Sequence, residues 1–374
     1  MKRLKNQLYI DFAMKILYSN KSLYPYEGGA DISAFTLLEH LAEKHEVSAY
    51  YIGDIKENSK VKLYPQKIKQ KKGLWINLFF LRRKWKKILK KAIEKEKPDL
   101  IISQDYFIGP SVKIAKKYGV KSIIFLRSYF HLSIDNFKSY LPEEGKFTSK
   151  DLIYQLQWPF FKFVVKESKW ALKNADLVCS VSNYMRDVTL KFCNVKSEVV
   201  RPFVSFNECK AERKGDYILY INPDKHKGKE IFEKIATLLP LKKFLVAGKK
   251  DYKTELMNVD VVGFEDKKEI YSKGRLLLVP SIFPDPHPRV VVEAMVNGIP
   301  CVVSDRGGLR EEVGGAGVIV EDIFDIDEWV KKIKAFDDEE FYKKMSKYSQ
   351  FKALEFEDKR QFIRFEHLLS KLFN

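Results

Sequence analysis

Two carboxylates, Asp285 and Glu293, lie eight positions apart in the segment 280–313. Carboxylates at this spacing make the segment a candidate ligand-binding site. Asp285 lies in a loop broken by prolines, whereas Glu293 lies within a short predicted helix, 289–297. Pro288 directly before this run suits a helix start. The free N–H groups and the dipole at such a start favour an anionic ligand such as a phosphate. Glu293, one turn further in, can reach a hydroxyl-rich group beside that anion, which indicates a nucleotide sugar, among other ligands.

A β-branched run, 300–304, follows this helix and ends in Asp305-Arg306-Gly307-Gly308. The segment is therefore predicted to form a loop, a helix, a strand and a second loop. In open α/β sheets such loops lie at the carboxyl ends of strands, where ligands bind.

The same segment resembles the retaining glycosyltransferases of family 4, which have the GT-B fold. Their pattern is a Glu, seven residues, Glu-Ala-Met, a Gly and a Pro, Ser-Asp-x-Gly-Gly and a later Glu. The matching residues are Glu293-Ala294-Met295, Gly298, Pro300, Ser304-Asp305, Gly307-Gly308 and Glu311. The resemblance implies that Glu293 holds the ribose of the donor nucleotide. It places Asp285 where the family has the Glu that contacts the donor sugar, with a side chain one methylene shorter.

Two more motifs match this family. Gly28-Gly29 precedes a predicted helix and alone is more often a simple turn, but it has the place of the family's glycine loop, which touches the donor diphosphate and the acceptor. Lys227 precedes a Gly, as in the family's Lys-Gly, whereas Asn222 stands where the family has a second diphosphate-holding residue, an arginine. Lys227 is therefore expected to carry the charge of the leaving group.

The nearby Lys225 and Lys229 are interpreted as ordinary surface residues. In the first domain the family often has a His after a strand, near the reacting centre. By spacing, Arg127 takes that place and His131 lies one helical turn onward. An arginine could clamp an acceptor or a phosphate, and which of the two residues serves is left open.

His287 stands where the family commonly has an aromatic residue, so the resemblance implies a polar edge against the donor and an uncommon donor sugar. The full set of donor-binding residues implied is Gly28, Gly29, Asn222, Lys227, Gly263, Asp285, His287, Arg289, Val290 and Glu293. The catalytic set is Asp285, Lys227 and Arg127.

Metal chemistry is not expected. Asp325-Ile326-Asp327 matches an Asp-x-Asp metal motif superficially, but it precedes a predicted helix, and helix capping explains it better. No other His, Cys and Asp cluster has metal spacing. The resemblance implies a UDP- or GDP-linked sugar as donor, with no metal and no other cofactor.

The length of 374 residues suits two domains. Four cysteines without a Cys-x-x-Cys pair suggest neither zinc nor a disulfide framework, which fits a reducing compartment. No apolar run reaches the roughly 18–20 residues of a spanning helix. Predicted strands alternate with helices, which favours parallel α/β layers. The predicted strands are 14–19, 47–52, 100–103, 122–125, 177–182, 217–221, 244–247, 259–262, 276–279 and 300–304. The family resemblance implies a GT-B fold, in which two Rossmann-like domains face across a cleft and the last helix crosses back.

The expected organisation is an acceptor-binding domain, 1–206, that begins with an extension, 1–13. A linker, 207–216, precedes a donor-binding domain, 217–355, and a helix, 356–374, returns to the first domain.

The net charge of +18 indicates attraction to polyanions or to an anionic membrane. The run 58–93 contains no acidic residue, and its lysines and arginines surround an apolar stripe made of Leu78, Leu81, Trp85, Ile88 and Ala92. Such a helix is typical of an interfacial membrane element anchored by Trp75, Phe79 and Trp85. A helix that packs its stripe on the core shows the same pattern, so both interpretations stay open. Nucleic-acid binding is disfavoured because no recognition motif accompanies the charge.

The sequence thus predicts a cytoplasmic glycosyltransferase, peripheral on the inner face of the membrane. It would move a hexose-type sugar to a saccharide or lipid-linked acceptor, and the resemblance implies that the anomeric configuration is retained. The alternatives are a sugar-nucleotide epimerase of the same fold and a non-enzymatic binder of membranes or polyanions.

Overall fold

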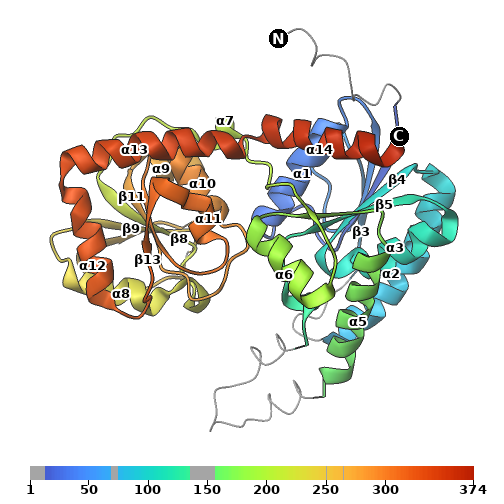
Figure 1. Cartoon of the computed structure of the whole chain (residues 1–374), viewed down its shortest axis with the longest axis horizontal. Coiled ribbons are helices and arrows are strands. Elements are labelled where there is room, and N and C mark those ends of the chain that lie inside the picture. The colour runs from blue at the N-terminus through green and yellow to red at the C-terminus, as the bar shows by residue number, and fades with distance from the viewer. Residues whose placement is uncertain (1–12, 69–74, 135–155, 250, 264) are drawn as a thin grey trace. The chain divides into compact units, whose positions relative to one another are not determined.

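The computed structural model describes residues 13–68, 75–134, 156–249, 251–263 and 265–374 (Figure 1). The chain divides into two compact units: Met1–Arg201 with Phe362–Asn374, and Pro202–Gln361. The extension 1–13 lies outside the described residues except for its last residue. The division falls after residue 201, not after 206. The predicted linker belongs to the second unit because its short helix α7 (Phe206–Cys209) buries Cys209 in that unit's core.

Unit 1 is built on a seven-stranded sheet with the order β3-β2-β1-β4-β5-β6-β7, in which every neighbouring pair is parallel. The strands are β1 (Lys15–Ser19), β2 (Glu46–Ile52), β3 (Lys62–Gln66), β4 (Leu100–Gln104), β5 (Lys121–Leu126), β6 (Leu177–Ser180) and β7 (Glu198–Val199). The helices are α1 (Gly29–Leu41), α2 (Trp75–Glu96), α3 (Ile108–Tyr118), α5 (Trp158–Asn174) and α6 (Asn183–Cys193), with 3-10 turns at Asp105–Phe107 and Phe130–Leu132.

Unit 2 has a six-stranded parallel sheet with the order β10-β9-β8-β11-β12-β13. Its strands are β8 (Tyr217–Ile221), β9 (Phe244–Ala247), β10 (Val259–Val261), β11 (Gly274–Val279), β12 (Cys301–Ser304) and β13 (Gly317–Val320). Its other helices are α8 (Lys229–Leu238), α9 (Lys267–Ser272), α10 (Arg289–Val296), α11 (Leu309–Val313), α12 (Ile326–Lys334) and α13 (Glu339–Ala353), with 3-10 turns at Lys225–Lys227, Gly314–Ala316, Ala335–Asp337 and Leu354–Phe356.

The last helix, α14 (Asp358–Phe373), begins in unit 2, and its residues from Phe362 onward belong to unit 1. There Phe362 stacks on His40 of α1 with a ring-centroid distance of 4.9 Å, and Phe365 packs against Phe125 of β5. Two parallel-sheet, Rossmann-like units joined by such a helix confirm the predicted GT-B fold class.

Each sheet has one point where the strand order reverses, between β1 and β4 in unit 1 and between β8 and β11 in unit 2. At each reversal, the loops after the two flanking strands turn to opposite faces of the sheet. A crevice therefore opens between these loops at the carboxyl edge of the sheet. Lys227 follows β8 and Asp285 follows β11. The topology therefore brings these two predicted site residues to the same crevice.

The apolar stripe of α2 packs on the core of unit 1, as the core-packing interpretation of this helix predicts. Trp85 is fully buried, and its indole Nε1 donates to Ser19 Oγ at 2.9 Å. Leu89 and Ala92 are buried in the same cluster, and Trp75 is buried against Phe161 of α5. The prediction that Trp75 and Trp85 anchor the chain in a membrane is therefore wrong, because both rings are inside the protein.

One charge of α2 is also buried. The Arg82 guanidinium, 1% exposed, lies 2.8 Å from the Glu167 carboxylate of α5. Glu167 is equally buried and takes two more cations, Lys86 at 2.8 Å and Lys113 of α3 at 2.6 Å. Gly109 of α3 packs so closely that a Cβ there would lie 2.3 Å from Arg82 Nη2. A four-residue ion cluster thus ties α2, α3 and α5 together.

Local chemistry explains other boundaries. Asp325 caps α12 by accepting from the backbone N–H of Glu328 at 3.1 Å, which confirms that the Asp-x-Asp sequence is a helix cap.

All four cysteines are buried free thiols. Within the described ranges no helix is long and apolar enough to cross a membrane.

The Arg82–Glu167 pair generates a stability prediction. Glu167→Gln should lower the free energy of unfolding by about 3–5 kcal/mol, because it leaves a buried guanidinium without its carboxylate. Urea denaturation followed by tryptophan fluorescence measures this. The control is Glu94→Gln, which changes an exposed acid of α2. It should lower the free energy of unfolding by less than about 1 kcal/mol. The double variant Arg82→Met with Glu167→Met should recover most of the loss; equal loss in the single and double variants would contradict the ion-pair account.

Candidate functional site

Glu293 is the centre of the candidate donor site in unit 2. It lies on α10, is 4% exposed, and its carboxylate is surrounded by donors from two helices. Lys267 Nζ lies at 2.7 Å and the Tyr271 hydroxyl at 2.9 Å, both from α9, and Arg289 Nη2 lies at 3.3 Å, one turn earlier on α10. Burial alone would raise the pKa of Glu293, but the charges of Arg289 and Lys267 outweigh it and hold the pKa below its usual range. Glu293 is therefore an ionised carboxylate in a nearly dry place.

Lys227 and Asp285 form the second part of this site. Lys227 Nζ and Asp285 Oδ2 make a direct ion pair between the loop after β8 and the loop after β11. Both side chains keep partial access to solvent. An ion pair of this kind is a point where an incoming phosphate can exchange for the carboxylate as the partner of the lysine.

Close backbone contact between the two loops positions that pair. Gly228 has φ +80°, and a Cβ there would lie 1.9 Å from the Pro280 carbonyl oxygen, so only glycine fits. The His226 carbonyl accepts from the backbone N–H groups of Ile282 and Phe283, each at 3.1 Å. The Lys-Gly motif is thus a docking point for the neighbouring loop as well as a source of charge.

The loop that carries Asp285 is also held from its other side. Gly308 N–H donates to the Asp285 carbonyl at 2.8 Å. Gly307, with φ +61°, packs against the same backbone, where a Cβ would lie 2.5 Å from that carbonyl oxygen. This gives a physical reason for the Gly-Gly pair that follows β12: it lets two loops of the carboxyl edge touch.

His287 does not form a polar edge toward a ligand, which corrects the prediction for its side chain. Its ring is buried, and Nδ1 lies 2.7 Å from Glu312 Oε1 on α11. The other side of the ring packs edge-on against Phe356. The sequence did not reveal this because Glu312 lies 25 positions away, and nothing local to His287 sets its side-chain direction.

The remaining predicted donor residues have these places. Asn222 is exposed just after β8 with φ +59°, and its side chain lies against Gly248. Gly263 follows β10, and its carbonyl accepts from Gly248 N–H at 2.9 Å. Val290, in the first turn of α10, packs partly on the core. Their contact with a donor stays a prediction.

In unit 1, Gly28 and Gly29 lead into α1 as predicted. Gly28 is extended, with φ −178°, which any residue can adopt, but the space beside its Cα is open. Its place at the carboxyl edge beside the β1–β4 reversal suits the close approach of a ligand to the backbone. Asp31 in the first turn is buried and accepts from Ser22 Oγ and Glu27 N–H, both at 2.9 Å.

Arg127 follows β5 and is held in one orientation. Its Nε donates to Gln104 Oε1 at 2.8 Å and its Nη1 to Ser33 Oγ at 3.0 Å. Asp105 Oδ1 accepts from the backbone N–H groups of Arg127 and Ser128, at 3.0 and 3.1 Å. The ends of β4 and β5 and helix α1 therefore meet at this arginine.

The choice between Arg127 and His131 is made by burial. His131 is fully buried beside Tyr106, with a ring-centroid distance of 5.1 Å. Burial and the charge of Arg82 lower its pKa to about 3. The half-buried Arg127 is the better candidate for contact with a ligand.

Sequence reasoning missed Asp105, Gln104, Lys267 and Tyr271. Gln104 and Asp105 directly follow the predicted strand 100–103, and polar residues at that position of a parallel sheet are a signal that could have been used. Lys267 and Tyr271 carried no such signal. Their relation to Glu293 arises only when α9 packs beside α10.

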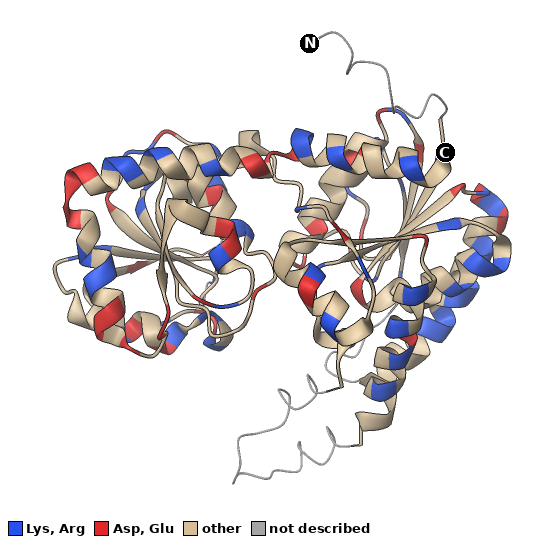
Figure 2. Cartoon of the chain, viewed as in Figure 1, with Lys and Arg blue, Asp and Glu red and all other residues tan. Residues whose placement is uncertain are grey.

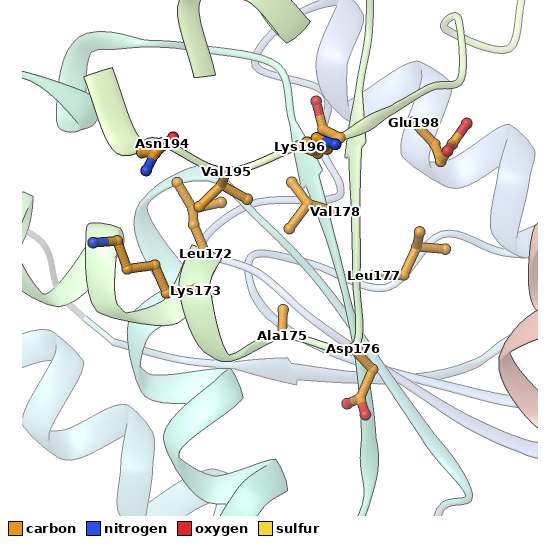
Figure 3. Close-up of a pocket in the computed structure, with 11 residues that line it drawn as sticks. Leu172, Lys173, Ala175, Asp176, Leu177, Val178, Asn194, Val195, Lys196 and Glu198 are labelled. Atoms are coloured by element: carbon orange, nitrogen blue, oxygen red, sulfur yellow. The ribbon is translucent and has the colours of Figure 1, made fainter. Parts of the chain in front are cut away.

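A separate pocket of about 430 Å³ lies elsewhere in unit 1 (Figure 3). Its lining comes from the end of α5, the start of β6 and the loop between α6 and β7, including Lys173, Leu177 and Glu198. This is the amino edge of the sheet, opposite the edge where open α/β sheets bind ligands. None of the predicted site residues lines it. In the described part of the chain, no three His, Cys, Asp or Glu residues are grouped so as to hold a metal ion.

Comparison with protein families gives two matches that together span both units. The family described as Glycosyltransferase Family 4 matches residues 27–207, and Glycosyl transferases group 1 matches residues 215–351. A protein of Klebsiella pneumoniae, described as an uncharacterized 42.6 kDa protein in the cps region, is 27% identical over 358 residues. This match covers 84% of this chain and 92% of that protein.

Solved structures share the fold. Sucrose-phosphate synthase from Thermosynechococcus elongatus superposes with a TM-score of 0.77 at 18% identity, covering 96% of this chain and 99% of that chain. Anabaena HepE in complex with UDP-glucose gives 0.73 at 16% identity, covering 96% of this chain and 100% of that chain. At these identities the likeness shows the fold alone, which is that of GT-B glycosyltransferases.

The half-buried Asp105 generates a pH prediction. Burial raises the pKa of Asp105 to about 6, against the opposing hydrogen bond and charge of Arg127. The folded state therefore holds a proton that the unfolded state releases near pH 4, so Asp105 makes stability fall as pH rises through about 4 to 6. Asp105→Asn keeps the acceptor oxygen and removes this fall. Between about pH 4 and 7 its unfolding free energy should decline by on the order of 1–3 kcal/mol less than the parent's.

Urea denaturation over that pH range makes the measurement. Asp187→Asn, at an exposed aspartate of α6, is the matched control and should follow the parent. Parallel curves for the Asp105 variant and the parent would contradict the raised pKa.

Proposed function

The chain belongs to glycosyltransferase family 4, and on that premise we propose that it transfers a hexose-type sugar from UDP or GDP to an acceptor with retention of configuration. One observation carries the proposal: a buried, ionised Glu293 shares the carboxyl edge of unit 2 with a lysine-bearing loop. Nucleotide sugars need both a hydroxyl acceptor for the ribose and a cation for the diphosphate. Anabaena HepE was solved with UDP-glucose, which supports a nucleotide-sugar donor for this fold.

In this proposal Glu293 accepts the ribose hydroxyls. A carboxylate offers about four acceptor positions, and three donors, Lys267, Tyr271 and Arg289, already point at it. The ribose therefore takes the remaining position or displaces Lys267, the most exposed of the three. Arg289 and Tyr271 keep the carboxylate charged and oriented.

Lys227 would exchange its partner when the donor binds. The diphosphate replaces Asp285 as the anion beside Lys227, and Asp285 is released to accept from a sugar hydroxyl. The lysine charge then opposes the negative charge that grows on the departing diphosphate, as does the N-terminus of α10. No metal or other cofactor has a role in this proposal.

Unit 1 would bind the acceptor, a saccharide in free or lipid-linked form, with Arg127 at its edge. Gln104 and Ser33 hold that guanidinium in one orientation, so that its positive charge can attract an acceptor hydroxyl or phosphate. We place the protein at the inner, cytoplasmic face of the membrane, as a peripheral protein.

Glu293→Gln should weaken binding of the preferred nucleotide by about 1–3 kcal/mol, because a charge-assisted hydrogen bond to the ribose becomes a neutral one. A thermal-shift screen of UDP, GDP and ADP identifies that nucleotide, and titration calorimetry measures its affinity. Glu269→Gln changes an exposed acid of α9 and should leave affinity unchanged. Identical affinities for the Glu293 variant and the parent would refute the ribose assignment.

Lys227→Ala should reduce turnover more than it weakens binding of the nucleoside without phosphates, because the lost charge acts on the diphosphate. Lys225→Ala, on the same turn and exposed, is the control and should keep parental turnover. The measurement is steady-state release of nucleoside diphosphate. Release should depend on acceptor, which a sugar-nucleotide epimerase would not require.

Two outcomes count against this part of the proposal. Parental turnover in Lys227→Ala would assign the role to another residue. Activity that disappears with a chelator and returns with manganese would overturn the metal-free reaction.

A further inference from the structure

The outer faces of α2, α3 and α5 concentrate positive charge on unit 1 (Figure 2). Together these helices carry fifteen Lys and Arg residues and three Glu residues, and so supply two thirds of the net charge of +18. We call their solvent-facing side the basic surface. Its exposed cations are Arg83, Lys84, Lys87, Lys90, Lys91 and Lys95 of α2, Lys116 and Lys117 of α3, and Lys162, Lys166 and Lys173 of α5.

Almost nothing on these helices compensates that charge. Glu167 is buried and already shared among Arg82, Lys86 and Lys113. The other two acids, Glu94 and Glu96, lie in the last turn of α2. Glu94 lies 3.9 Å from Lys90 and Glu96 lies 3.4 Å from Lys95. In the described part of the chain the other exposed cations of the basic surface make no ion pair with an acid of their own helices.

Exposed aromatic rings lie among these cations. Phe80 of α2 is 57% exposed, and Trp158, Phe163 and Trp170 of α5 are 36–37% exposed. They are not scattered. Phe79 joins Phe163 across the two helices, with a centroid distance of 4.9 Å.

The cations and rings form one surface. Lys113 Nζ of α3 lies 5.9 Å from the Phe163 ring and 5.5 Å from the Trp170 ring. Arg83 lies 4.6 Å from the Phe79 ring. The three helices therefore present cations and aromatic groups side by side.

We propose that the basic surface docks the protein on an anionic lipid bilayer. Lysines near a membrane are attracted to anionic head groups, and aromatic side chains settle at the head-group level. The combination fits a membrane better than a nucleic acid, since Lys is a point charge while Arg is preferred for nucleic-acid recognition, and the exposed cations are nearly all Lys. In this proposal the aromatic side chains that contact the bilayer are Phe80 and the exposed rings of α5, not the buried Trp75 and Trp85.

The inference rests on the proposed function only for its purpose, which is to bring unit 1 to a lipid-linked acceptor. Docking itself depends on the surface alone. It can therefore be tested apart from catalysis, and the two can fail separately.

The test uses the full chain and sedimentation with two vesicle types, phosphatidylcholine alone and phosphatidylcholine mixed with phosphatidylglycerol. The charge variant is Lys84→Glu, Lys87→Glu, Lys91→Glu, Lys162→Glu and Lys166→Glu. In the described part of the chain these lysines are exposed and make no ion pair, so their replacement should not disturb folding. The control changes the charge equally on unit 2: Lys234→Glu, Lys268→Glu, Lys331→Glu, Lys334→Glu and Lys347→Glu.

The parent should sediment with the anionic vesicles, and less so at higher salt, because salt screens exposed charges. The charge variant should lose at least about tenfold in partition to those vesicles, and the control less than about twofold. At high salt, where the charge attraction is screened, the double variant Phe80→Ser with Trp170→Ser should bind the anionic vesicles more weakly than the parent. The control Phe351→Ser, which removes an exposed ring of α13, should bind them as the parent does. Equal sedimentation with both vesicle types, or equal loss in the charge variant and the control, would overturn the proposal.

Two further measurements separate the alternatives. Tight binding of single-stranded DNA that the charge variant abolishes, together with no binding to anionic vesicles, would replace the bilayer with a nucleic acid. Nucleotide affinity, measured by thermal shift, should be the same in the parent and the charge variant. If neither the parent nor the charge variant binds a nucleotide, that result would count against the proposed function but would leave the docking result intact.

Discussion

Parallel pairing of every strand in the two sheets is the constraint on which both candidate sites depend. Because the strands of a sheet run the same way, each loop that follows a strand emerges at one edge. Lys227 and Asp285, 58 positions apart, form an ion pair for this reason. In unit 1 the same geometry brings the chain after β4 and β5 together, where Asp105 holds the backbone of Arg127. Neither site would exist if one of these strands were reversed.

Buried carboxylates set the electrostatics of both units. A charge taken out of water is tolerated only with partners, and Glu293 and Glu167 each have three donors around them. The consequences differ. In unit 2 the cations keep Glu293 ionised at an edge that a ligand can reach. In unit 1 Arg82, Lys86 and Lys113 share the single charge of Glu167. That carboxylate is therefore not available to the outward lysines of the same helices, which give unit 1 its strongly positive surface.

The prediction of elements succeeded where the signal was local. The runs 217–221 and 244–247 are strands with those bounds, and Arg289 begins a helix after Pro288. The strands β3, β7 and β13 were not predicted. β3 contains Pro65 and lies at the sheet edge, where a missing N–H is tolerated but the sequence no longer looks like a strand. β7 has two residues, too few for any pattern.

The sequence by itself determined the alternation of strands and helices, the family resemblance and the loops that carry Lys227, Asp285 and Glu293. These features depend on periodicity, capping and turn residues, which act over a few positions. Only the tertiary structure decided that Trp85 faces the core, that His287 turns toward Glu312 and that Lys267 reaches Glu293. Side-chain direction depends on partners brought together by packing, and those partners are far away in the sequence, so no local pattern contains them.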